Sequence, residues 1–116
     1  MRRLFFILML TAFFDAGAEV AAVEENGGEA SKCFLNYQEG EYDKAVDCAN
    51  SFLYAGTVTD SARLAKLYEV LGVCFGMLEK KGSARVAFNK LLDLKPDYEL
   101  DPNVYLPEII SMFQIA

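Results

Sequence analysis

The fold is decided by residues 68–96, which read YEVLGVCFGMLEKKGSARVAFNKLLDLKP. Apolar residues recur at spacings of three and four on both sides of the polar stretch at residues 79–82, and this periodicity is typical of two amphipathic helices. We therefore predict one helix over about residues 60–78 and, after a turn at residues 80–82, a second helix that Ser83 caps. Pro96 ends the second helix, because proline lacks a backbone donor and clashes with the preceding turn.

The same stretch carries a spaced motif. An aromatic residue is followed by two residues, Leu-Gly, two residues and a second aromatic, and then come Ala, three residues, Phe and a closing Pro; the positions are Tyr68, Leu71, Gly72, Phe75, Ala84, Phe88 and Pro96. This pattern resembles one complete tetratricopeptide repeat (TPR), with Tyr in place of the usual first Trp. The resemblance implies a helical hairpin in which the small residues Gly72 and Ala84 allow the two helices to approach closely.

A second unit precedes this one. Residues 37–45, YQEGEYDKA, resemble the turn in the middle of a TPR unit. We predict a helix over residues 30–38, which Gly40 ends in a left-handed conformation, and a helix over about residues 42–54. The distance from Ala45 to Ala84 exceeds the family's usual length of about 34 residues, so we place an insertion at residues 55–59. Thr59 or Asp60 then caps the next helix.

The C-terminal part continues the helical pattern after a loop. Pro102 and Pro107 interrupt it, so we predict a loop over residues 97–106 and a short last helix that Pro107 opens. The apolar residues of that helix would form an exposed patch alone, so we expect it to cap the second unit. Leu100-Asp101-Pro102 is similar to a C-terminal extension of exported TPR proteins from some Gram-negative bacteria. The predicted fold is all-α: a short α-solenoid of about two TPR-like hairpins plus a C-terminal capping helix, over residues 30–116.

The first 18 residues have the layout of a secretory signal peptide. Arg2 and Arg3 give a positive start, residues 4–14 are apolar, and small residues end at Ala18. The apolar run is shorter than the roughly 20 residues that span a bilayer, and the alternative is an uncleaved membrane anchor. We expect cleavage after Ala18, a flexible acidic tail over residues 19–29, and export to the periplasm or cell envelope of a Gram-negative bacterium. Membrane contact is then limited to the signal peptide before cleavage.

The composition narrows the function classes. The net charge is −6, with 11 basic and 17 acidic residues, and loss of Arg2, Arg3 and Asp15 with the signal peptide makes it −7. This balance argues against nucleic acids and anionic membrane surfaces, which attract basic patches. The chain has no His, which removes Ser-His and Cys-His catalysis and His-based metal sites. We therefore expect neither enzymatic activity nor a cofactor.

Three cysteines remain after cleavage. Cys33 and Cys48 lie on adjacent antiparallel helices of the predicted fold, so a disulfide is geometrically possible if their Cα atoms come within about 7 Å. The alternative is a pair of small buried residues. Cys74 is expected to be a buried thiol. The acidic residues at 97, 99 and 101 share the alternation of a calcium loop but lack its Gly and closing Glu, so a solvated acidic turn is the better interpretation and we expect no metal.

The TPR resemblance also implies a binding surface. In that family the first helix of each pair lines a concave face that commonly binds peptides or extended protein segments. Carried over residue by residue, the partner-binding positions are Phe34, Tyr37, Gln38, Lys66, Glu69, Val73, Gly76 and Met77. The alternative is that Phe34 and Tyr37 pack against the N-terminal tail or another copy of the chain. We predict a noncatalytic scaffold or adaptor that binds another protein or peptide segment, with a self-associating structural component of the envelope as the alternative.

Overall fold

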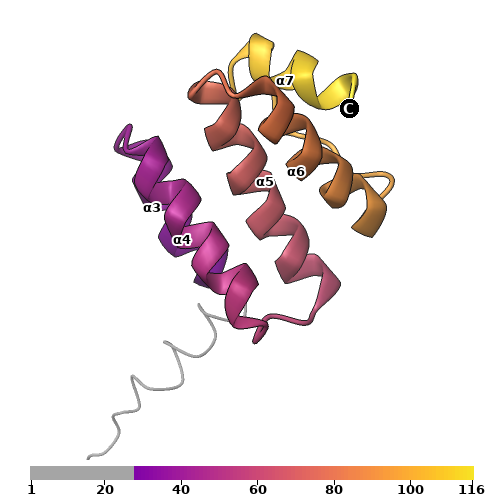
Figure 1. The fold of residues 1–116 in the computed structure, drawn as a ribbon. Helices are drawn as coiled ribbons and strands as arrows, with labels where there is room; N and C mark the ends of the chain where they lie inside the picture. The colour runs from indigo at the N-terminus through magenta and orange to yellow at the C-terminus, as the bar shows by residue number, and fades with distance from the viewer. Residues whose placement is uncertain (1–27) are drawn as a thin grey trace, which may run out of the picture.

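The computed structural model describes residues 28–116, which form five α-helices and no strand (Figure 1). The all-α prediction is confirmed for this part of the chain, whereas the predicted signal peptide and residues 19–27 of the tail lie outside the described residues. None of the described helices has the length and apolar character of a membrane span. The helices are α3 (Gly28–Gln38), α4 (Tyr42–Ala55), α5 (Ser61–Met77), α6 (Lys81–Leu94) and α7 (Pro107–Gln114).

Local chemistry sets most of the helix ends. Gly40 and Gly56 take φ angles of 79° and 69°, and this left-handed conformation reverses the chain after α3 and α4. Asp60 caps α5, because its carboxylate accepts a hydrogen bond of 3.1 Å from the backbone N–H of Arg63. Pro107 occupies the first turn of α7. The predicted roles of Gly40, Asp60 and Pro107 are confirmed, and α3 begins at Gly28, within two residues of the predicted start.

The turn between α5 and α6 comes earlier than predicted. Glu79 adopts a left-handed φ of 62°, so the chain reverses over residues 78–80 and α6 begins at Lys81. The backbone N–H of Ala84 already donates to the carbonyl of Lys80 at 2.9 Å. Ser83 therefore lies inside the helix, and the prediction that it caps α6 is wrong. A non-glycine residue in the left-handed region is uncommon, which is why the pattern favoured Gly82 as the turn residue instead.

The helices form two hairpins beside each other, α3 with α4 and α5 with α6, and α7 lies across the end of the second hairpin (Figure 1). Helix α5 is central, because it contacts each of the other four. It is apolar on most of its surface, as expected for a helix enclosed by others. The loop between α6 and α7 runs back along α5 and supplies part of the lining of the site described below.

Two glycines of α5 allow close packing. A Cβ at Gly72 would lie 2.6 Å from Phe88 Cδ1, and one at Gly76 would lie 2.6 Å from Ile109 Cδ1. Phe88 is fully buried, and its ring meets that of Phe113 edge-on with centroids 5.3 Å apart. The absence of side chains at these two positions therefore lets α6 and α7 pack directly on α5.

Candidate functional site

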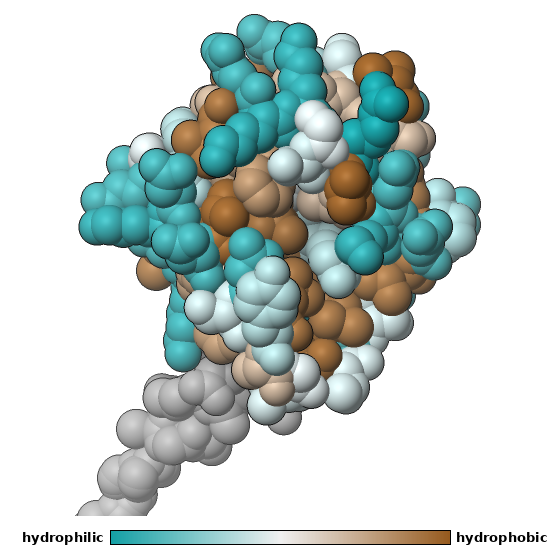
Figure 2. Space-filling view, in the orientation of Figure 1, coloured by the Kyte–Doolittle hydropathy of each residue, from teal (hydrophilic) through white to brown (hydrophobic). Residues whose placement is uncertain are grey.

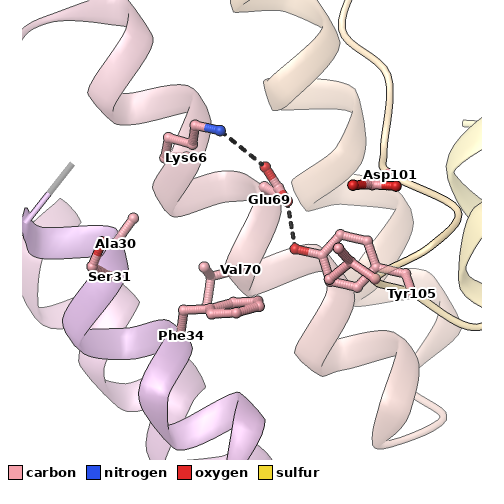
Figure 3. A pocket seen from close by; sticks show the side chains of 9 residues that line it. Ala30, Ser31, Phe34, Lys66, Glu69, Val70, Asp101 and Tyr105 are labelled. Carbon is pink, nitrogen blue, oxygen red and sulfur yellow. Dashed lines mark hydrogen bonds and ion pairs between the residues drawn. The ribbon is translucent and has the colours of Figure 1, made fainter. Parts of the chain in front are cut away.

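The face formed by α3 and α5 contains a hollow of about 350 Å³, which we call the α3–α5 hollow (Figure 3). Apolar side chains from both helices form its floor, and charged side chains stand at its rim. The part of the chain that joins α6 to α7 supplies one wall. The lining residues are Ala30, Ser31, Phe34, Lys66, Glu69, Val70, Asp101, Val104 and Tyr105.

Residues 97–106, which we name the tyrosine loop, form that wall. Tyr105 is 5% exposed, and its ring lies edge-on to Phe34 at 6.4 Å and to Tyr37 at 5.7 Å between centroids. Phe34 and Tyr37 stack on each other at 5.1 Å. The two aromatic residues predicted to contact a partner thus pack against the chain's own loop.

Glu69 holds the tyrosine loop on α5. The phenol groups of Tyr98 and Tyr105 each donate a hydrogen bond to a different carboxylate oxygen of Glu69, whose side chain is 15% exposed. Lys66 adds a cation, with its Nζ 4.0 Å from the carboxylate and 5.7 Å from the centroid of the Tyr98 ring. Figure 3 shows Lys66, Glu69 and Tyr105 in line along the hollow. Both oxygens of Glu69 are occupied, so this carboxylate anchors the loop rather than facing the solvent.

The surroundings keep the tyrosines neutral. Burial raises the pKa of Tyr105 and of Tyr98, and the negative charge and hydrogen bond of Glu69 raise both pKa values further. Burial also raises the pKa of Tyr37, with smaller contributions from Tyr42 and Cys74. A phenol that stays protonated is a hydrogen-bond donor and not a base. Tyr98 and Tyr105 therefore remain hydrogen-bond donors that attach the loop to Glu69.

The structure separates the other residues predicted for the partner-binding face. Val73 is 1% exposed and belongs to the buried cluster that includes Leu100 and Ile109, so in this conformation it offers no surface to a partner. The tyrosine loop and α7 cover that side of α5. Gly76 and Met77 line a separate hollow beside α7, and Gln38 is exposed at the end of α3 without lining the α3–α5 hollow. Phe34, Lys66 and Glu69 are the predicted residues that meet in one place.

A disulfide joins Cys33 and Cys48, the two residues considered as a pair from the sequence, with their Cα atoms 5.4 Å apart. It ties α3 to α4 directly beside Phe34, so the covalent link fixes one wall of the hollow. Cys74 is a buried free thiol, and burial raises its pKa to about 12. It is therefore protonated and unreactive near neutral pH.

The acidic turn in the tyrosine loop is solvated. Asp101 is exposed, and its carboxylate accepts a hydrogen bond of 2.9 Å from the backbone N–H of Asn103. This contact is an Asx-type turn, which shapes the loop locally. In the described part of the chain no three His, Cys, Asp or Glu side chains come together in a way that could hold a metal ion.

No family model, curated protein or solved structure matches this chain. Function must therefore be inferred from the hollow and the chemistry of its lining. An apolar floor of Phe34 and Val70 with Lys66 and Asp101 at the rim suits the binding of a side chain from another molecule.

Proposed function

We propose that this protein is a noncatalytic interaction scaffold of the cell envelope, built from two TPR-like hairpins, which binds a short segment of a partner protein in the α3–α5 hollow. The TPR-like arrangement is supported by the contact of Gly72 with Phe88 and by the full burial of Ala84, three positions of the family motif. The disulfide Cys33–Cys48 supports an oxidising compartment, where such links persist.

The observation that carries the proposal is the shape and lining of the hollow. Its volume of about 350 Å³ lies at the small end of the range for binding pockets, so it admits one or two side chains of a partner. Burial of one large apolar side chain contributes about 1.5–3 kcal/mol, which by itself gives a weak contact. The exposed Lys66 and Asp101 at the rim offer one donor and one acceptor to polar groups that flank the inserted side chain.

The tyrosine loop limits what can bind. A partner that covered the face of Tyr37 packed on Tyr105 would have to displace Tyr105 and break its hydrogen bond to Glu69. A partner in the α3–α5 hollow leaves that loop in place and uses Tyr105 as a wall. Binding in the α3–α5 hollow requires no rearrangement of the tyrosine loop, so we favour it over binding along the whole length of α3 and α5.

Cross-linking of the tagged full chain in its own cells, with fractionation and mass spectrometry, tests this function. Ser31→Trp should fill the hollow from its edge and abolish cross-linking to the partner. Ser31 is exposed, so its replacement leaves the core intact. Ser51→Trp makes the same change on an exposed part of α4 and should retain the partner. A partner that is retained equally by both variants would refute binding in the hollow.

Self-association is the second candidate, and the surface near α7 favours it. Leu106 is 49% exposed and Ile115 is 71% exposed, and large apolar groups at one end of a short helical array can meet those of another copy. Ile115→Asp should then convert an oligomer to a monomer in light scattering. Recovery of the chain alone by cross-linking would support this candidate, and a monomeric wild-type chain would reject it.

A further inference from the structure

A second depression lies between α4 and α6, with α5 as its base, and we call it the α4–α6 groove. Figure 1 shows α4 and α6 in front of α5, and in the same orientation Figure 2 shows apolar surface in the hollow between polar fringes. Its volume is about 430 Å³. The lining residues are Asn50, Leu53, Tyr54, Tyr68, Leu71, Phe75, Ser83, Val86, Ala87 and Lys90.

The rims of this groove carry apolar groups in contact with water. Tyr54 projects from α4 with 87% of its surface exposed, and Val86 projects from α6 with 55% exposed. Leu71 and Phe75 of α5 continue the apolar surface across the base. A continuous apolar floor with raised apolar rims is the form of a surface that another molecule covers.

The groove is lined by a basic residue, whereas the chain as a whole is acidic. The chain has 17 acidic and 11 basic residues, yet none of the described residues that line the groove is acidic. Lys90 is the lining cation, and it forms no salt bridge with another described residue. Asn50, Ser83 and the phenol of Tyr54 are further hydrogen-bond donors along the same groove. This combination is complementary to carboxylates.

The backbone of the groove selects the form of the occupant. All three walls are α-helices, whose N–H and C=O groups are bonded within each helix, so the groove has no sheet edge to pair with an extended strand. An extended segment would leave its own backbone groups unpaired over an apolar floor, which is unfavourable for each group. A helix arrives with its backbone satisfied and offers a stripe of apolar side chains.

We propose that the α4–α6 groove binds an amphipathic helical segment of a partner protein whose apolar stripe is flanked by Asp or Glu. The stripe covers Leu53, Leu71 and Val86, and a flanking carboxylate reaches Lys90. This site is separate from the α3–α5 hollow and does not depend on it.

Nuclear magnetic resonance of the ¹⁵N-labelled full chain, expressed with residues 1–18 in place and purified in the form that the cell retains, tests the proposal. The probes are three synthetic helical peptides that share one leucine stripe and differ in flanking residues, which are Glu, Gln or Lys. The Glu peptide should shift the backbone amides of residues 50–54 and 83–90 and bind about fivefold more tightly than the Lys peptide, the scale expected for one partly exposed ion pair. Because the whole chain is acidic, nonspecific attraction would favour the Lys peptide instead.

Three variants of α6 localise the effect. Lys90→Glu should remove the preference for the Glu peptide, whereas Arg85→Glu makes the same charge change at an exposed position outside the groove and should preserve it. Val86→Glu should weaken all three peptides at least about tenfold, and its exposed position keeps the fold intact.

Three results would overturn the proposal. The first is equal affinity for the Glu and Lys peptides. The second is a set of shifted amides confined to α3 and the tyrosine loop. The third is a change in the amide chemical shifts of residues 50–54 and 83–90 when the protein is diluted without peptide. Such a change would identify a second copy of the chain as the occupant.

Discussion

The substitution Tyr105→Phe should lower the free energy of unfolding by about 1.5–3 kcal/mol, the range for a hydrogen bond to a charged group. The phenol of Tyr105 donates to Glu69, whose side chain is 15% exposed, so water replaces the lost donor only in part. Phenylalanine keeps the ring contacts with Phe34 and Tyr37. The change therefore isolates one O–H group. Tyr105→Ala also removes the buried ring and should cost about 3–5 kcal/mol.

Urea unfolding followed by circular dichroism measures this effect as a lower midpoint with an unchanged slope. Tyr54→Phe is the matched control, because Tyr54 is 87% exposed and the loss of its O–H should stay within about 0.5 kcal/mol. Combining Tyr105→Phe with Glu69→Gln should cost less than the sum of the single changes, by at least about 0.5 kcal/mol. Equal midpoints for Tyr105→Phe and Tyr54→Phe would refute the claim that Glu69 anchors the tyrosine loop.

Three further predictions concern pH, packing and the disulfide. The folded state raises the pKa of Tyr98 and Tyr105 above their ordinary value of 10.0, so the contribution of these two groups to stability should be constant below about pH 10 and fall above it. Urea midpoints measured at rising alkaline pH should therefore fall less for Tyr105→Phe than for the wild type. Gly72→Ala should lower the free energy of unfolding by about 1–3 kcal/mol, measured by thermal unfolding, because a Cβ there meets Phe88. Gly82→Ala should be neutral or stabilising, because Gly82 lies in a helix with open space around it, and equal effects of the two changes would contradict the close packing at Gly72. Replacing Cys33 and Cys48 together by Ala should cost about 2–4 kcal/mol by calorimetry, given a sequence separation of 15 residues, and no loss would show that the link is dispensable.

The sequence predicts helices well where periodicity and local signals agree. The residue spacing around Gly72 indicates both the α5–α6 hairpin and the small residue at its contact, and Gly40 and Pro107 mark helix ends by their own backbone chemistry. The turn at Glu79 could not be read in the same way, because a left-handed glutamate depends on how α6 packs on α5 and not on the intrinsic preference of the residue.

The site was predictable only in part. Phe34, Lys66 and Glu69 follow from the TPR resemblance, and they meet in the α3–α5 hollow. Tyr98 and Tyr105 were missed, since a loop has no period that says where its side chains point. A usable signal was nevertheless present: two tyrosines and two leucines in a short loop between Pro96 and Pro107 need apolar cover, and the nearest cover is the face of α5.

The burial of α5 explains why some predicted partner-binding positions lie in the core and why variants on α3 and α6 report on binding more directly. The sides of α5 face different sites, with Lys66 and Val70 at the α3–α5 hollow and Leu71 and Phe75 at the α4–α6 groove. A helix that is apolar on most of its surface is largely enclosed, so the partner-binding positions transferred onto it from the TPR resemblance include buried residues such as Val73. Substitutions on α5 would perturb folding before binding. Variants at exposed positions of α3 and α6 keep the core intact. Loss of binding in an α3 variant can therefore be assigned to the α3–α5 hollow, and loss of binding in an α6 variant to the α4–α6 groove.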